Sequence, residues 1–266
     1  MIVHPNAKIN LGLNIVRKRE DGFHDIETVF YPIPMTDVLE ITRDEKTSFS
    51  SSGIEIPGEG NLVMKAYDLL KKDFSLDDLK VHLHKRVPIG AGLGGGSSDA
   101  AFMLKAVRDY CRLPLSNEQL KSYAAKLGSD CSFFIDNRAS YAWGRGELME
   151  PLDLWLKDYH MLLIYPNLHI STAQAYSRVV PKSSEVNARD VIARPVEQWK
   201  DLLINDFEIS AFELYPELKK LKADLYHIGA LYACMSGSGS SFFGIFKEKK
   251  ELGAAMKKYS HWWLEL

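Results

Sequence analysis

Apolar and polar residues alternate strictly along one stretch near the start of the chain, residues 7–15. Ala7 and every second residue after it are apolar, whereas the residues between them are polar or glycine and include Lys8 and Asn10. Successive side chains of a strand point to opposite faces, so this pattern predicts a half-buried strand. We expect Lys8 and Asn10 to lie side by side on the face away from the core.

Patterns along the rest of the chain predict both strands and helices. Turn signals and β-prone runs indicate strands at residues 24–31, 38–42, 48–56, 79–84 and 161–165, a hairpin around residues 144–146, and a strand–glycine–strand unit around 236–241. Asn61 is placed to cap a helix that ends at Lys71 and Lys72, and Ser116 with Gln119 forms a capping-box pattern for a helix that Gly128 can stop. Further helices are expected at residues 99–111, 171–178, 196–204 and 217–226.

The length of 266 residues suits one large domain or two modest ones. We expect two lobes around a cleft, with a boundary near residues 151–158 and an exposed connection at residues 183–189.

Composition excludes several classes of function. A net charge of −2 and a pI near 6.5 argue against a protein that binds nucleic acid through a basic face. The three cysteines are far apart and lack metal-ligand or CxxC spacing, so we expect reduced thiols. The N-terminus does not resemble a signal peptide, and no apolar run reaches the ~20 residues of a membrane span. The expected location is the cytoplasm.

A glycine loop is the most informative segment of the sequence. Five glycines occupy the seven positions 90–96, directly before Ser97, Ser98 and a helical pattern. Glycines let backbone amides approach a ligand, and the start of a helix favours anions. The segment therefore predicts a phosphate cradle, although glycine and serine alone would also suit a flexible loop.

Two better-known phosphate loops fit this segment poorly. A Walker loop requires a lysine before its final serine or threonine, and no lysine occurs between Gly90 and Asp99. The spacing of Gly90, Gly92 and Gly95 matches the dinucleotide fingerprint, but the second strand and acidic residue that should follow are missing.

The loop instead resembles the signature of the GHMP kinases, the superfamily of galactokinase, homoserine kinase, mevalonate kinase and phosphomevalonate kinase. The matching pattern is P-x3-G-L-G-G-G-S-S-[DN]-A, at residues 88–100. Three further segments match in the expected order, at residues 5–11, 128–134 and 235–241. The resemblance implies an α+β, two-lobed GHMP kinase fold with the active site in the cleft between lobes, divided into domains 1–154 and 155–266.

Within this superfamily, residues 7–11, 19–24 and 203–207 resemble the 4-diphosphocytidyl-2-C-methyl-D-erythritol kinase family, and this likeness covers nearly the whole chain. The resemblance implies transfer of a phosphoryl group from ATP, with Mg²⁺, to the 2-hydroxyl of a cytidine-diphosphate-linked substrate in the non-mevalonate route to isoprenoid precursors. It implies no nucleic acid, membrane or obligatory protein partner. Another GHMP kinase, for mevalonate, homoserine or a sugar, and a non-catalytic ligand sensor or RNA-binding relative are the alternatives.

The resemblance also assigns roles to individual residues. Asp130 would accept the hydroxyl proton, with Lys8 beside it keeping it ionised, although from the pattern alone the two could form a structural ion pair. The residues assigned to the nucleotide are Asn61, Lys85, Pro88, Gly90, Gly92, Leu93, Gly94, Gly95, Gly96, Ser97 and Ser98, the two serines contacting phosphates or Mg²⁺. No carboxylate ligand of the metal is identified.

The substrate is assigned to a separate set of residues. Phe23 and His24 form an aromatic pair after a turn, which suits stacking on a pyrimidine but also ordinary half-buried packing. Family members often carry tyrosine at the position of Phe23, so a hydroxyl contact is lost there while stacking survives. The full assigned set is Asn10, Phe23, His24, Phe30, Tyr176, Gly237, Ser238 and Gly239, of which the last three could equally form a tight strand turn.

Overall fold

The structure is a computed structural model that describes residues 1–58, 61–182 and 186–266. By its contacts the chain divides into two compact units, each discontinuous in sequence. The first unit contains residues 1–7, 35–89 and 94–138, and the second unit contains residues 8–34, 90–93 and 139–266. The division into sequence domains at residues 154 and 155 stays a prediction, because contact units and sequence domains need not coincide.

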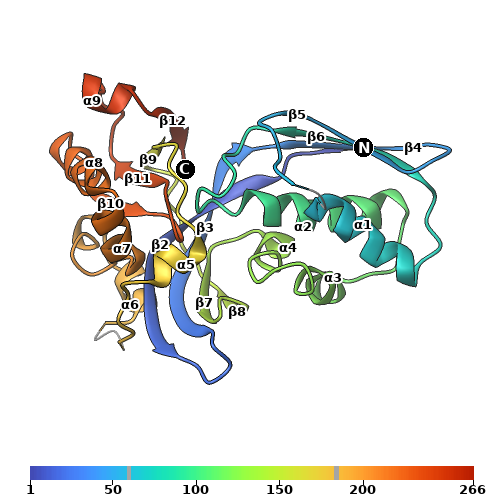
Figure 1. Ribbon diagram of the computed structural model, residues 1–266, viewed down its shortest axis with the longest axis horizontal. Helices are drawn as coiled ribbons and strands as arrows, with labels where there is room; N and C mark the ends of the chain where they lie inside the picture. Colours follow the sequence, from blue (N-terminus) through green and yellow to red (C-terminus); the bar gives the residue numbers. More distant parts are fainter. Residues whose placement is uncertain (59–60, 183–185) are drawn as a thin grey trace. The chain divides into compact units, whose positions relative to one another are not determined.

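The first unit is a four-stranded sheet with helices on one face (Figure 1). The strand order is β1-β4-β6-β5, and only the pairing of β5 with β6 is parallel. The strands are β1 (Ile2–Val3), β4 (Val38–Arg43), β5 (Ser48–Gly53) and β6 (Leu79–Lys85). The helices are α1 (Leu62–Asp73), α2 (Gly95–Tyr110), α3 (Asn117–Ala124) and α4 (Phe133–Asp136), and α1 and α2 pack against each other.

Local signals explain where these helices begin. The Asn61 side chain accepts a hydrogen bond from the Val63 amide at 2.7 Å, which confirms the predicted cap of α1. Both hydrogen bonds of the predicted capping box are present at the start of α3. Two boundaries were wrong: α3 ends at Ala124, before Gly128, and α2 begins at Gly95 rather than at Asp99.

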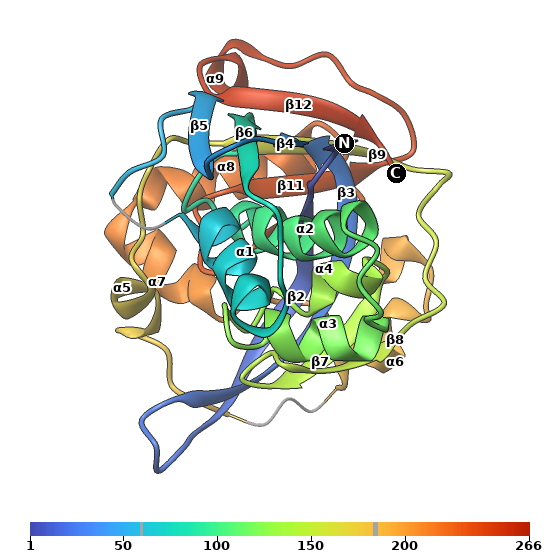
Figure 2. The same cartoon turned by 90° about the vertical axis from the view of Figure 1, so that its right-hand side faces the viewer.

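The second unit contains two four-stranded sheets, with the orders β2-β3-β7-β8 and β10-β11-β9-β12. The strands are β2 (Asn6–Lys18), β3 (His24–Thr36), β7 (Ser140–Gly144), β8 (Leu148–Pro151), β9 (His160–Tyr165), β10 (Tyr232–Met235), β11 (Phe242–Phe246) and β12 (Ser260–Glu265). The helices are α5 (Thr172–Tyr176), α6 (Ala188–Ile192), α7 (Phe207–Leu214), α8 (Pro216–His227) and α9 (Ala254–Lys257). Helix α8 packs on β10 and β11, and its buried leucines join the core of this unit. Figure 2 shows β11, β9 and β12 of this sheet side by side.

The strand β2 corrects the first sequence-based expectation. Lys8 is 3% exposed and Asn10 is 1% exposed, so the face that we expected to meet solvent is as buried as the apolar face. The reason is that the polar face of β2 is covered by other polar groups, including Thr28 and Ser236, which both bond to Asn10. Alternation therefore identified the strand correctly but not the surroundings of its polar face.

Helices of the second unit were predicted less completely. Residues 196–204 contain only a short 3₁₀ turn (Val196–Gln198), and α7 and β12 were not predicted. Of the expected connection at 183–189, residues 183–185 lie outside the described residues, and α6 begins at Ala188. No helix in the described part of the chain is both long and apolar enough to cross a membrane.

Candidate active site

The second half of the glycine loop, in the first unit, leads directly into α2. Gly94 has a left-handed backbone with φ of 68°, and the helix begins at the next residue without a side-chain cap. The first amides of a helix have no partner within the helix, and its dipole favours an anion there. Because α2 has no acidic residue in its first turn, these amides can face phosphate without a competing carboxylate.

A buried cluster of charges supports this first turn. The Lys85 ammonium pairs with Asp37 and, at 2.7 Å, with Asp99 Oδ2, and none of the three side chains is more than 4% exposed. A Cβ atom at Gly95 would lie 3.0 Å from Lys85 Nζ, so the ammonium packs directly under the glycine loop. The assigned contact of Lys85 with the nucleotide stays a prediction, and its established contacts are these two carboxylates.

The two carboxylates of the cluster differ in their surroundings. Asp37 Oδ1 accepts hydrogen bonds from the amides of Arg86 and Val87 at 2.6 and 2.8 Å. Asp99 Oδ1 is buried without a hydrogen-bond partner among the described residues. Burial raises the pKa of Asp99 to about 7; Lys85 opposes this shift and the nearby charge of Asp37 adds to it.

Asp130 belongs to the same unit and lies in the turn between α3 and α4. The turn is held by a hydrogen bond of 3.1 Å from the Cys131 amide to the Gly128 carbonyl. Burial raises the pKa of the Cys131 thiol to about 11, and the neighbouring Ser97 opposes this shift. Helix α4, which follows the turn that carries Asp130, packs against α2, and Lys105 Nζ of α2 donates to the Phe134 carbonyl at 3.2 Å. Consistent with reduced thiols, all three cysteines are free.

Lys8 belongs to the second unit, where a chain of hydrogen bonds orients it. Lys8 Nζ donates to Asn10 Oδ1 at 2.6 Å, Asn10 Nδ2 donates to Thr28 Oγ1 at 3.0 Å, and Thr28 Oγ1 donates to the Gly12 carbonyl at 2.5 Å. The ammonium also lies over the Phe30 ring, 4.8 Å from its centroid. The prediction that Lys8 and Asn10 are neighbours is confirmed. Thr28 was missed because nothing in the sequence links it to them.

The glycine loop at residues 90–96 and a second glycine loop, at residues 236–241, both contact β2 at these same residues. The Lys8 amide donates to the Leu93 carbonyl at 2.9 Å, so the first half of the first loop, residues 90–93, lies against the strand. Ser236 Oγ donates to the Gly92 carbonyl at 2.8 Å and accepts from the Asn10 amide at 3.3 Å. The second unit thus brings the two loops together beside Lys8 and Asn10.

Glycine is required where the two loops meet. Gly92 has φ of 78°, and a Cβ atom there would lie 1.9 Å from the Ser236 carbonyl oxygen. Gly237 has φ of 54°, and its Cβ would lie 3.2 Å from the Gly92 carbonyl oxygen. Of the remaining assigned loop residues, Pro88 and Leu93 are buried, whereas Gly90 and Gly96 are exposed. Ser238 is half-buried.

The residues assigned to the cytidine differ widely in exposure. The rings of His24 and Tyr176 stack with centroids 4.5 Å apart and planes at 23°, so the structure brings these two together. Phe23 is 54% exposed, whereas Phe30 is 2% exposed beneath Lys8. Burial, with a smaller contribution from Lys18, lowers the pKa of His24, which favours its neutral ring.

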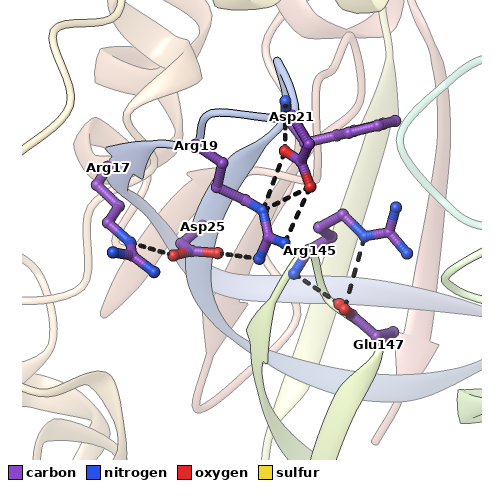
Figure 3. A network of polar contacts seen from close by, with 7 residues as sticks. Arg17, Arg19, Asp21, Asp25, Arg145 and Glu147 are labelled. Carbon is purple, nitrogen blue, oxygen red and sulfur yellow. Dashed lines mark hydrogen bonds and ion pairs between the residues drawn. The ribbon is translucent and has the colours of Figure 1, made fainter.

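Ion pairs hold the hairpin turn that carries Phe23 (Figure 3). Arg17 and Arg19 both pair with Asp25, and Arg19 also pairs with Asp21 at 2.9 Å. Asp21 Oδ1 in turn accepts a hydrogen bond from the Phe23 amide at 3.1 Å.

One face of the Phe23 ring already has a neighbour. The Arg145 guanidinium lies 5.0 Å from the ring centroid, and the Arg145 amide donates to Glu147 at 2.6 Å. Arg145 was not among the residues singled out from the sequence, because its contact with Phe23 joins two hairpins that are distant in sequence.

The chain matches two family models, the GHMP kinases N terminal domain over residues 61–139 and the GHMP kinases C terminal domain over residues 190–263. Among solved structures, Methanococcus jannaschii mevalonate kinase superposes with a TM-score of 0.73 at 14% identity, over 100% of this chain and 98% of that one. The chain therefore has the α+β fold of the GHMP kinases, as expected from its motifs.

Proteins with higher sequence identity to this chain identify its family within the GHMP kinases. A 4-diphosphocytidyl-2-C-methyl-D-erythritol kinase from Parabacteroides distasonis is 51% identical over 93% of this chain and 92% of its own length. A protein of the same name from Bacteroides fragilis is 50% identical over 95% of this chain and 94% of its own length. A solved 4-(cytidine 5'-diphospho)-2C-methyl-D-erythritol kinase has a TM-score of 0.84 at 30% identity, over 99% of this chain and 98% of that one. The chain belongs to the family of 4-diphosphocytidyl-2-C-methyl-D-erythritol kinases.

Proposed function

We propose that this protein transfers the γ-phosphoryl group of ATP to the 2-hydroxyl of 4-(cytidine 5'-diphospho)-2-C-methyl-D-erythritol. One observation in the structure carries the proposal: the buried ammonium of Lys8, hydrogen-bonded to Asn10, lies where both glycine loops meet the strand β2. The identity of about half of the residues with kinases named for this substrate supports the choice of acceptor. The reaction belongs to the non-mevalonate route to isoprenoid precursors.

Phosphoryl transfer depends on positioning and on compensation of negative charge. The amides of the first glycine loop and the first turn of α2 hold the ATP phosphates in this proposal. Lys8 compensates charge on the transferring group and, with Asn10, orients the acceptor hydroxyl. Asp130 accepts the hydroxyl proton, and the helix that follows its turn, α4, packs against α2.

Magnesium fits this arrangement as an ion carried by the nucleotide. Within residues 1–58, 61–182 and 186–266, no group of three or more His, Cys, Asp or Glu residues is placed to hold a metal ion. Mg²⁺ in kinases keeps several waters and takes further oxygens from substrate phosphates, so it needs few protein ligands. A cradle of amides without a competing carboxylate suits such a nucleotide-bound ion. When bound, Mg²⁺ supplies positive charge that stabilises the phosphate oxygens.

Recognition of cytidine falls to the second unit in this proposal. The base stacks on Phe23, on the face opposite Arg145, and His24 and Tyr176 complete the pocket. Residues Gly237, Ser238 and Gly239 contact the diphosphate through their backbone. The observation that favours a cytidyl acceptor over mevalonate or homoserine is this exposed ring, because those substrates have no base to stack.

A substrate panel tests the proposal. The purified chain is given ATP and Mg²⁺ with the cytidyl substrate, methylerythritol 4-phosphate, mevalonate, homoserine or galactose, and both ADP and the phosphorylated alcohol are measured. We expect equal amounts of ADP and phosphorylated cytidyl substrate, and little reaction with the alcohols that lack cytidine. Preference for another alcohol would assign a different GHMP kinase activity, and absence of transfer to any of them would indicate a binding protein. The cytoplasmic location stays a prediction.

A further inference from the structure

The buried side-chain amide of Asn205 is hydrogen-bonded to the two neighbours of Ser236, the serine that joins the two glycine loops. Asn205 is 2% exposed. Its Nδ2 donates to the carbonyls of Met235 and Gly237, each at 2.8 Å, and its Oδ1 accepts from the Phe207 amide at 3.0 Å. These carbonyls belong to the residues on either side of Ser236, so a single side chain fixes the Met235–Ser236 and Gly237–Ser238 peptide units.

The backbone that Asn205 holds lies against β2, the strand that carries Lys8 and Asn10. Ser236 contacts the Asn10 amide and the Gly92 carbonyl, and a Cβ atom at Gly237 would lie 3.4 Å from Asn10 Oδ1. Asn10 Oδ1 is the atom that accepts from Lys8 Nζ. A shift of the Ser236–Gly237 backbone would therefore displace Asn10, whose Oδ1 accepts the hydrogen bond from Lys8 Nζ.

Asn205 is itself fastened to β2, further along the same strand. The Leu13 amide donates to the Ile204 carbonyl and the Asp206 amide donates to the Leu13 carbonyl, both at 2.8 Å. Asp206 Oδ2 accepts from the Ile15 amide at 2.7 Å. The strand that carries Lys8 and Asn10 thus also fixes the backbone of Asn205, and the second glycine loop is held to β2 at two places.

We propose that Asn205 is a positioning residue for phosphoryl transfer. Its side chain holds the second glycine loop against Asn10, and Asn10 in turn orients the Lys8 ammonium for the reaction. The inference rests on the proposed function. An amide is suited to this role because one nitrogen donates twice while the oxygen accepts. An aspartate has the same shape but would face two carbonyls with an oxygen, and an alanine would leave both carbonyls without their partner.

Kinetics of Asn205→Asp test the proposal against a purely structural role. The matched control is Leu225→Val, which trims a fully buried side chain of α8, a helix of the same unit that contributes no residue to either loop. Both variants are assayed well below their melting temperatures. For Asn205→Asp we expect kcat to fall by about tenfold or more while the KM for ATP changes less than about threefold, and for Leu225→Val we expect near-normal kcat at a comparable loss of stability. Equal kcat losses in the two variants, or near-normal kcat in Asn205→Asp, would overturn the proposal.

Hydrogen exchange gives a second readout that does not need the cytidyl substrate. In the free enzyme, Asn205→Asp should increase exchange in peptides that cover residues 8–12 and 236–241, with little change in α8. Unchanged exchange in these peptides contradicts the proposal even if the substrate panel identifies a different acceptor. If Asn205→Asp does not fold, Asn205→Ser, which retains a single donor, is measured against the same two criteria.

Discussion

The two glycine loops are supported by different kinds of interaction. Under the start of α2, in the first unit, the support consists of charges: one ammonium, Lys85, between the carboxylates of Asp37 and Asp99. Behind the second loop, in the second unit, Asn205 and Ser236 hold backbone groups through neutral hydrogen bonds. Buried charges lose hydration and respond to pH, whereas neutral amides and hydroxyls do not titrate. The comparison indicates that the first support is the more costly and the more sensitive to pH.

The second unit also contains an ion pair near the second glycine loop, but this pair has one carboxylate for one ammonium. Glu208 pairs with Lys222 at 2.6 Å and accepts a hydrogen bond from the Met235 amide at 2.9 Å. One ammonium therefore meets one carboxylate, in contrast to the two carboxylates around Lys85. This pair provides a matched control for the charge cluster of the first unit.

The largest expected effect is that of Lys85→Met. Removal of the ammonium leaves two buried carboxylates without their cation, which should lower the free energy of unfolding by roughly 3–5 kcal/mol. Urea denaturation measures this change. Lys222→Met, at a side chain that is 17% exposed, should lower stability less. Equal losses in the two variants would contradict the distinction between unbalanced and balanced charge.

Gly92→Ala tests the contact between the two loops. The new Cβ would meet the Ser236 carbonyl oxygen at 1.9 Å and would also require φ of 78°. Gly22→Ala is the control, because Gly22 has φ of 83° and nothing within 4 Å of the added atom. The control isolates the backbone strain of roughly 1–3 kcal/mol. We expect Gly92→Ala to lose more stability than the control and most of its phosphoryl transfer. Comparable behaviour of the two variants would show that the loops are not held together at Gly92.

Asp99→Asn tests the pH sensitivity of the charged support. The folded pKa of Asp99, about 7, lies above its usual value of 3.8, so the folded state binds this proton more tightly than the unfolded state does. The protein should therefore lose stability as the pH rises from about 4 to about 7, and Asn at this position should remove that loss. Thermal melts at pH 5 and pH 8 measure it. From pH 5 to pH 8, we expect the melting temperature of the parent to fall by at least about 2 °C relative to that of Asp99→Asn. The same change of melting temperature in both proteins would contradict the account.

The smallest expected effect is at Asn61, which separates helix capping from nucleotide binding. Asn61→Ala removes the cap of α1 and should lower stability by about 1 kcal/mol. Asn61→Asp retains the acceptor for the Val63 amide, so its stability should stay near that of the parent. The KM for ATP then reports on the assigned nucleotide contact. A raised KM in Asn61→Asp at unchanged stability supports that contact, and an unchanged KM removes it.

The sequence predicted what depends on neighbouring residues. The cap at Asn61, the capping box at Ser116 and the glycine loop rest on short-range rules, and the structure contains all three. Contacts between distant segments were not predictable in the same way. Asn205 bonds to carbonyls 30 and 32 residues away, so no local pattern marks its role.

The buried polar face of β2 and the missed helix α7 have similar causes. Alternation identifies a strand but does not say what covers its polar face, and that cover comes here from loops distant in sequence. Helix α7 is short. Asn205 Oδ1 accepts from the Phe207 amide at its start, and the side chains of Asn205 and Asp206 are held by bonds to other segments. Among the assigned site residues, Lys8 and Asn10 were found from alternation, whereas their roles came from the resemblance to a family.

The most direct measurement is the rate of phosphoryl transfer to the cytidyl substrate in a double-mutant cycle of Lys8→Met and Asp130→Asn, with ATP affinity measured in parallel. The account predicts that Asp130→Asn lowers the rate by roughly 10²–10⁴-fold while ATP affinity changes little. It also predicts that the double variant is little slower than the worse single variant, because the two residues serve one step. Near-normal transfer by Asp130→Asn, or strictly multiplicative losses, would contradict the account.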